Sequence, residues 1–258
     1  MAADAPRATR RPGTGTAVRD RRLAGLPLFA SWSGGKDAYL ALQRAGAAGG
    51  RPRALLSMLE EGGARSRGHG LPLETLRAQA AALGLPLVTR ATTWDDYEEH
   101  FLDALGELRS RGVTCGVFGD IDLEPHREWV ERVCESAGLE SRLPLWQEPR
   151  RVLLDELLAH NVRATVVVVR ADRLDAGFLG RELDRDLVAD LEAAGVDACG
   201  EEGEYHTLVI DAPLFACAVP VSFDGVSERD GCRLLDVRLA DPTAADLRSE
   251  PDTEKGHA

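Results

Sequence analysis

Cysteine is scarce in this sequence, and its five cysteines are too far apart to form a recognisable motif. Their number is odd and no Cys-x-x-Cys pair occurs, which argues against a disulfide framework and against a zinc site. This pattern predicts a reducing, cytoplasmic compartment. Long hydrophobic runs are also missing, because the longest strongly apolar run, Thr165 to Val169, is far too short to cross a bilayer.

Lysine is almost absent, since Lys36 and Lys255 are the only two. The 43 acidic residues outnumber the 31 basic ones, which gives a formal net charge of −12. Nucleic acids and anionic membranes are bound mainly through Lys and Arg, so a chain this acidic is a poor general binder of either. We therefore expect neither nucleic acid nor membrane as a partner, although a local basic pocket is compatible with these numbers.

The 258 residues suffice for one large domain or two modest ones, and strand-like and helix-like segments alternate from Leu26 onward. This alternation predicts a Rossmann-like α/β fold, with a parallel sheet covered by helices on both faces. Strands are expected at 27–32, 53–59, 86–91 and 114–118, and helices at 37–48, 73–83, 94–111 and 124–137.

The alternation loosens after about residue 145. A helix at 151–160, a strand at 164–170 and a helix at 182–194 precede a turn rich in glycine and acid, which runs into a strand ending at Asp211. Short β segments are expected beyond residue 214. We therefore predict a nucleotide-binding domain over 26–145 and a smaller α+β domain over 146–240, with loose tails at 1–25 and 241–258.

The first strand ends in the run Ser33-Gly34-Gly35-Lys36-Asp37, directly before a helix. Ligands of parallel α/β sheets bind at the carboxyl ends of strands, and the free amides of a helix N-terminus attract anions. The run is not a Walker A loop, which needs glycine where Ala30 stands and Ser or Thr where Asp37 stands. It predicts a different phosphate-binding loop, and a glycine turn that only caps the helix is the alternative.

This run resembles the PP-loop of the ATP pyrophosphatases. These enzymes have a HUP-type domain and belong to the adenine nucleotide alpha hydrolase-like superfamily. Ala38 departs from that pattern, in which Ser is usual. Three later stretches make the chain similar to the diphthine–ammonia ligase family, in order from about Leu26 to Phe223. These stretches are Gly119-Asp120-Ile121 with His126-Arg127-Glu128-Trp129, then Pro144-Leu145-Trp146, then Gly200 to Thr207 with Asp211 to Phe215.

The resemblance implies an ATP-dependent amidation with Mg²⁺ as the second cofactor. A carboxylate attacks the α-phosphorus of ATP, pyrophosphate leaves, and ammonia then displaces AMP from the acyl-adenylate. The acceptor is diphthine in the family's name, and another small-molecule or protein carboxylate is the alternative. No amidotransferase segment is evident, so ammonia comes free or from a partner, and a homodimer is a candidate assembly. The implied phosphate-binding residues are Ser33, Gly34, Gly35, Lys36 and Asp37, with Asp37 also a candidate Mg²⁺ ligand.

Candidate catalytic residues follow from the same stretches. Asp120 lies just past the strand at 114–118, and Glu201, Glu204 and His206 cluster within six positions. Carboxylates near a triphosphate can hold Mg²⁺, and a carboxylate or an imidazole can deprotonate ammonium. Lys36 completes the catalytic set. A solvated acidic turn with a hydrogen-bonded histidine is the alternative interpretation.

Five further residues are candidates for substrate contact. Arg67 and His69 stand in a glycine-rich loop after the second strand, and Arg127 could bind a carboxylate or phosphate bidentately. Tyr205 and Thr207 belong to the acidic turn and complete the set. A mobile solvated loop and a surface arginine are the alternatives for the first three.

Two other functions remain open at this point. A non-catalytic nucleotide sensor is favoured by Ala38, which removes one hydroxyl from the loop. A PP-loop enzyme that modifies tRNA is disfavoured by the acidic charge and by the lack of the paired cysteines that thiolation commonly uses.

Overall fold

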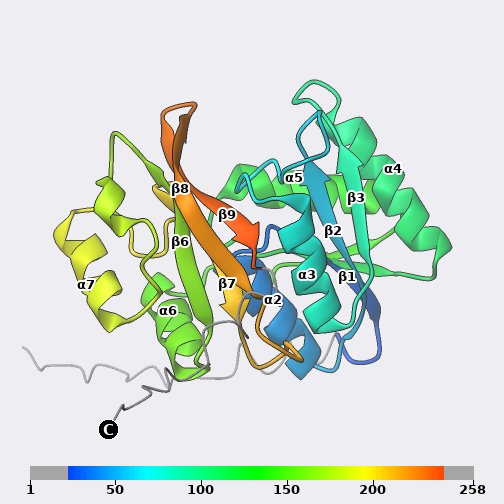
Figure 1. Ribbon diagram of the computed structural model, residues 1–258. Helices are drawn as coiled ribbons and strands as arrows, with labels where there is room; N and C mark the ends of the chain where they lie inside the picture. The colour runs from blue at the N-terminus through cyan, green and yellow to red at the C-terminus, as the bar shows by residue number, and fades with distance from the viewer. Residues whose placement is uncertain (1–22, 241–258) are drawn as a thin grey trace, which may run out of the picture.

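A five-stranded parallel sheet forms the first half of the molecule (Figure 1). The computed structural model describes residues 23–240, so the tails expected at 1–25 and 241–258 lie almost wholly outside the described residues. The strand order β3-β2-β1-β4-β5 confirms the predicted Rossmann-like architecture. The strands are β1 (Pro27–Ser31), β2 (Arg51–Leu59), β3 (Leu87–Ala91), β4 (Cys115–Val117) and β5 (Glu140–Arg142).

Helices cover both faces of this sheet because the side chains of β1 alternate between two apolar clusters. Leu28 and Ala30 pack with α2 and α3 on one face, whereas Phe29 packs with α4 and α5 on the other. The helices are α2 (Lys36–Ala47), α3 (Leu73–Leu83), α4 (Tyr97–Ser110) and α5 (Glu124–Ser136).

The sequence did not predict β5, which is a three-residue edge strand without a buried side chain. It pairs with β4 alone, so its conformation depends on its neighbour rather than on an apolar pattern of its own. The residues just before β1 also differ from expectation. Leu23 is buried and the Gly25 N–H donates to the Gly49 carbonyl, so residues 23–25 are attached to the domain.

The second sheet is antiparallel, with strand order β7-β6-β9-β8. Its strands are β6 (Arg163–Arg170), β7 (Tyr205–Asp211), β8 (Val221–Arg229) and β9 (Cys232–Leu239), accompanied by α6 (Arg150–Ala159), the 3₁₀ helix η1 (Ala176–Phe178) and α7 (Arg185–Ala193). The short segments expected beyond residue 214 are two long strands joined at Asp230 and Gly231, both with positive φ. The mostly exposed β8 lacks the alternation that predicts a strand.

The two sheets meet at the N-terminus of α2, which packs against both β1 and β7 (Figure 1). The Val209 N–H donates to the Gly34 carbonyl, and the buried Gln79 amide donates to the carbonyls of both residues. The loop after β1 is thereby held between the sheets. Within the described residues, no helix is long and apolar enough to cross a membrane.

Candidate functional site

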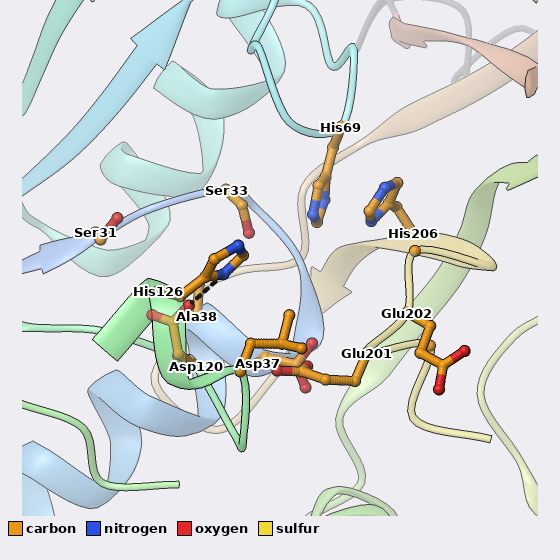
Figure 2. Close-up of a pocket in the computed structure, with 14 residues that line it drawn as sticks. Ser31, Ser33, Asp37, Ala38, His69, Asp120, His126, Glu201, Glu202 and His206 are labelled. Carbon is orange, nitrogen blue, oxygen red and sulfur yellow. Dashed lines mark hydrogen bonds and ion pairs between the residues drawn. The ribbon is translucent and has the colours of Figure 1, made fainter. Parts of the chain in front are cut away.

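An open cavity of about 640 Å³ lies where the ends of β1 and β4 face the turn before β7 (Figure 2). The two halves of the molecule both contribute to its wall. The lining residues are Ser31, Ser33, Asp37, Ala38, His69, Gly119, Asp120, Leu123, His126, Gly200, Glu201, Glu202, Gly203 and His206.

Neighbouring protein atoms leave no space for a side chain at either glycine of the loop after β1. Gly34 has φ of 84°, and a Cβ there would lie 2.8 Å from Gln79 Oε1. A Cβ on Gly35 would lie 2.5 Å from His69 Cε1, and the Gly35 N–H donates to Ser33 Oγ. The absence of these side chains lets the loop lie flat against α3 and the loop that carries His69.

The N-terminus of α2 opens into the cavity through Asp37 and Ala38. First-turn amides of a helix lack an intrahelical acceptor and carry the positive end of the helix dipole. The Lys36 N–H donates to Thr207 Oγ1 at 3.1 Å, whereas the next two residues, Asp37 and Ala38, line the cavity. Gly119 lies so close that a Cβ would be 2.8 Å from the Asp37 backbone carbon. This geometry suits a phosphate group.

The Lys36 side chain points away from the cavity and is buried. Its Nζ donates to Asp37 Oδ2 at 2.7 Å and to the Cys199 carbonyl at 2.5 Å. Burial is the largest single effect and lowers the pKa of Lys36. The charges of Asp37, Tyr205 and Cys199 and the hydrogen bond to Asp37 together outweigh it, so the pKa lies above its ordinary value. The structure therefore places a charged Lys36 between the loop and residue 199, against the expectation that it faces the nucleotide.

Glu201 and Asp120 form an acidic wall of the cavity. Glu201 Oε1 accepts from the Ile121 N–H at 3.1 Å, which joins the turn before β7 to the loop after β4. Burial raises the pKa of Glu201 to about 7, and the nearby carboxylates of Asp37 and Asp120 act in the same direction. A carboxyl group tuned to this range can exchange protons near neutral pH.

His126 supplies a proton-carrying group on the same wall. Its Nδ1 lies 3.1 Å from Asp120 Oδ1, and this hydrogen bond raises the pKa of His126 (Figure 2). His126 belongs to one of the motifs in the sequence but is not among the predicted site residues. Its position in the sequence could have identified it, because it stands in the first turn of the helix that follows Asp120.

His69 and His206 stack face to face at the mouth of the loop, with ring centroids 4.4 Å apart (Figure 2). Burial lowers the pKa of His69 to about 4 and that of His206 to about 3, so both rings are neutral at pH 7. His69 Nδ1 lies 3.2 Å from the Thr207 carbonyl, which can only accept, so this nitrogen carries the ring proton. Both candidates therefore line the cavity as uncharged rings.

Glu204 does not belong to the cavity, although its sequence neighbours do. Its carboxylate is buried and accepts from the backbone N–H groups of Asp197 and Glu202 at 3.2 and 3.1 Å. The Tyr205 hydroxyl donates to the Ala198 carbonyl. These two side chains brace the turn from inside and do not line the cavity, unlike the placement expected from a catalytic role of Glu204 and a substrate role of Tyr205.

The candidate arginines also lie outside the cavity lining. Arg67 stacks over Trp94 at 4.8 Å and donates to the Thr92 carbonyl. Arg127 stacks over Trp146 at 5.1 Å and pairs with Glu124. Neither is placed for the expected substrate contact. Ser31 and Glu202 line the cavity and were missed, although Glu202 directly follows a residue that was selected.

The carboxylates fit a magnesium ion held jointly with phosphate. Asp37 Oδ1 is buried and has no hydrogen-bond partner among the described residues, and Asp120 and Glu201 line the same cavity. Within residues 23–240, no group of three or more His, Cys, Asp or Glu residues is arranged to hold a metal ion. Mg²⁺ is commonly bound by one or two carboxylates together with substrate phosphates and water, which matches this donor set.

Comparison with known families gives two matches that follow each other along the chain. Residues 28–141 match the model of the diphthamide synthase N-terminal domain, and residues 149–230 match that of the diphthamide synthase C-terminal domain.

Curated relatives carry the name diphthine–ammonia ligase. The chain is 34% identical over 152 residues to the protein of Bos taurus, with 56% of each chain covered. It is 32% identical over 154 residues to that of Mus musculus, which covers 53% of this chain and 58% of the relative. Thus the chain spans somewhat over half the length of these relatives.

Among solved structures, the chain is similar to a predicted subunit of tRNA methyltransferase from Methanocaldococcus jannaschii. The sequence identity is 15% and the TM-score is 0.40, with 73% of this chain and 98% of that chain covered. A likeness at this level supports no functional inference.

Proposed function

The chain belongs to the diphthamide synthase family, and from that premise we propose that it is an ATP-dependent, AMP-forming carboxylate–ammonia ligase. A carboxylate oxygen of the acceptor attacks the α-phosphorus and the bond to the β-phosphate oxygen breaks, which gives an acyl-adenylate and pyrophosphate. Ammonia then attacks the acyl carbon and AMP leaves, so an amide forms. The names of the relatives support this reaction type.

The observation that carries the proposal is the meeting of two kinds of group in one cavity. The N-terminal amides of α2 suit phosphate, while Glu201 and the Asp120–His126 pair on the facing wall suit proton transfer. Ligation of ammonia needs both, because ammonium must lose a proton before it can attack beside the bound nucleotide.

We assign the phosphates to the first loop and the start of α2. The Ser33 hydroxyl and the backbone amides of Asp37 and Ala38 hold the pyrophosphate portion of ATP. Asp37 would hold Mg²⁺, and the bound ion would neutralise phosphate charge. Glu201 accepts the proton from ammonium, and His126 with Asp120 stabilises the charge that develops beside it. His206 and His69 close the mouth as neutral rings.

The proposal also covers the acceptor, the cellular compartment, the roles of the two domains and the assembly. The acceptor is a carboxylate on a protein or small molecule, diphthine being the one that the relatives' name indicates. All five cysteines are free thiols, which supports a reducing cytoplasmic setting. The first domain, 26–145, binds nucleotide, and the second, 146–240, closes the site. A homodimer remains the proposed candidate assembly.

A nucleotide sensor is the second candidate, and one observation favours it. Ala38 presents a methyl group to the cavity at the start of α2, where the family pattern has a hydroxyl. Thiolation of tRNA has no such support, since the cavity lining within the described part of the chain contains no cysteine.

Product analysis tests the proposal. The purified protein is incubated with ATP, Mg²⁺ and ¹⁵N-ammonium, with translation factor or cell metabolites as acceptor. We expect AMP and pyrophosphate in amounts that depend on the acceptor, and ¹⁵N in an amide product. Glu201→Gln is the control and should abolish amide formation while still binding ATP. Formation of ADP and phosphate would overturn the proposal, and bound but intact ATP with every acceptor would favour the sensor.

A further inference from the structure

The ammonium group of Lys36 is engaged by protein groups. It donates to the Cys199 carbonyl and to Asp37 Oδ2, and it lies 5.4 Å from the centroid of the Tyr205 ring. Two of its N–H donors are taken by these oxygens, and its positive charge lies beside the aromatic face. The side chain is only 4% exposed and does not line the cavity.

The main chain of Lys36 is tied to the same segment of the second sheet. Its N–H donates to Thr207 Oγ1, in place of the side-chain cap that Gly35 lacks. Cys199 and Thr207 stand at the two ends of the turn that carries Glu201, Glu202 and His206 toward the cavity. One residue at the start of α2 thus holds both ends of the segment 199–207, which consists of the turn and the first three residues of β7 and which we call the 199–207 turn.

We infer that Lys36 is a positioning residue, which fastens the 199–207 turn to the start of α2 and so holds Glu201 over the nucleotide site. The inference rests on the proposed function for the role of Glu201. The fastening itself rests only on the contacts of Lys36. Glu201 is also anchored by the Ile121 N–H at its side chain and by the Asp197 carboxylate at its main-chain N–H, but neither contact joins the turn to α2.

The contacts predict a specific effect of Lys36→Met, which keeps the length of the side chain and removes its charge. A charge-assisted hydrogen bond between partly buried groups holds a segment against local opening, so we expect backbone amides of the 199–207 turn to exchange with deuterium about tenfold faster or more. Because Lys36 does not touch phosphate, the affinity for inorganic pyrophosphate should change by less than about threefold.

A pair of variants at Thr207 controls for general loss of stability. Thr207→Val removes the acceptor for the Lys36 N–H while keeping the ammonium ion, so exchange in the turn should rise. Thr207→Ser keeps the hydroxyl and should restore slow exchange. Where Lys36→Met does not fold, this pair carries the test.

Hydrogen exchange and pyrophosphate binding are measured on the full chain without turnover, so the inference can fail independently of the proposed amidation. Faster exchange in the 199–207 turn with nearly unchanged pyrophosphate affinity supports it. Unchanged exchange in the turn overturns it, whatever the affinity. In the amidation assay, Lys36→Met should lower kcat about tenfold and leave KM for ATP within about threefold of the wild type. The reason is that losing the Lys36 contacts displaces Glu201 and leaves nucleotide binding unchanged.

Discussion

At the scale of single residues, the site depends on carboxyl groups whose neighbours differ. Glu201 is partly buried beside two other carboxylates, which raises its pKa to about 7. Glu204 lies three positions further on and accepts two backbone hydrogen bonds inside the turn. Glutamate therefore serves as a proton acceptor at position 201, whereas at position 204 it braces the turn.

The raised pKa of Glu201 predicts a dependence of stability on pH. The carboxyl keeps its proton to about pH 7 when folded but loses it near its ordinary pKa of about 4.3 when unfolded. The native state therefore binds more protons over this window, so Glu201 destabilises the fold as pH rises through it. Urea denaturation should show that Glu201→Gln gains stability relative to the wild type between pH 5 and pH 8. A constant difference across this range would contradict the raised pKa.

Ala38 gives a second prediction at this scale. Ala38→Ser adds a hydroxyl at the start of α2, on the cavity side, where it can donate to a phosphate oxygen. One added hydrogen bond should tighten ATP binding about three- to tenfold in calorimetry. Ala38→Val is the matched variant, because it adds volume without a donor and should weaken binding. Equal affinities for the Ser variant and the wild type would place the phosphates elsewhere.

At the scale of elements, the start of α2 is shaped by three glycines from two loops. The loop glycines Gly34 and Gly35 lie against the side chains of α3 and of His69, while Gly119 after β4 lies against the first turn of α2. The close approach brings β4 and its following loop, with Asp120, to the helix N-terminus. The position of the acidic wall relative to the phosphate site follows from this contact.

Gly119→Ala tests the contact. Its Cβ would lie 2.8 Å from the Asp37 backbone carbon and 3.0 Å from the Ala38 nitrogen, which cannot move without shifting the helix. We expect a loss of about 1–3 kcal/mol of stability and a fall in ATP affinity. Gly106→Ala is the control within α4, where a Cβ meets nothing within 4 Å, and should stabilise by about 0.5–1 kcal/mol. ATP affinity equal to the wild type in the Gly119 variant would refute the role of this contact.

Some strands could be predicted from the sequence and others could not. The first sheet was predictable because β1 and β2 are apolar runs and each helix that follows has a glycine or polar end. The edge strand β5 and the exposed β8 were not, since their pairing partners define them and their own side chains carry little apolar signal.

Within the site, motif positions located the cavity but not the direction of each side chain. Asp37, Asp120, Glu201, His69 and His206 were selected from sequence and all line it. Lys36, Glu204 and Arg67 were selected for their chemistry, yet each is drawn to a partner that only the tertiary structure supplies: Cys199, the backbone of the turn, and Trp94. Charge and spacing do not reveal such partners.

At the scale of the whole molecule, the two sheets share one apolar cluster. Leu28 and Ala30 of β1 belong to the same cluster as Val166 of β6 and Leu208 of β7. The cavity lies at this junction and draws its wall from both halves. Binding of the nucleotide and the stability of both halves should therefore be coupled.

This coupling predicts a single cooperative unfolding transition that ATP shifts as a whole. A ligand at 100 times its dissociation constant adds about 2.7 kcal/mol to the free energy of unfolding. Calorimetry with and without ATP and Mg²⁺ should show one peak that moves to higher temperature. Two peaks, of which ATP moves only one, would show that the halves unfold separately.

The central claim is that an acceptor carboxylate attacks the α-phosphorus of ATP in this cavity, and oxygen transfer tests it most directly. The acceptor is prepared with ¹⁸O in its carboxylate and incubated with the protein, ATP, Mg²⁺ and ammonium, and the nucleotide products are weighed by mass spectrometry. The account predicts AMP that carries one ¹⁸O atom, because the acyl-adenylate releases the bridging oxygen with AMP. Unlabelled AMP, or ADP with labelled phosphate, would contradict it.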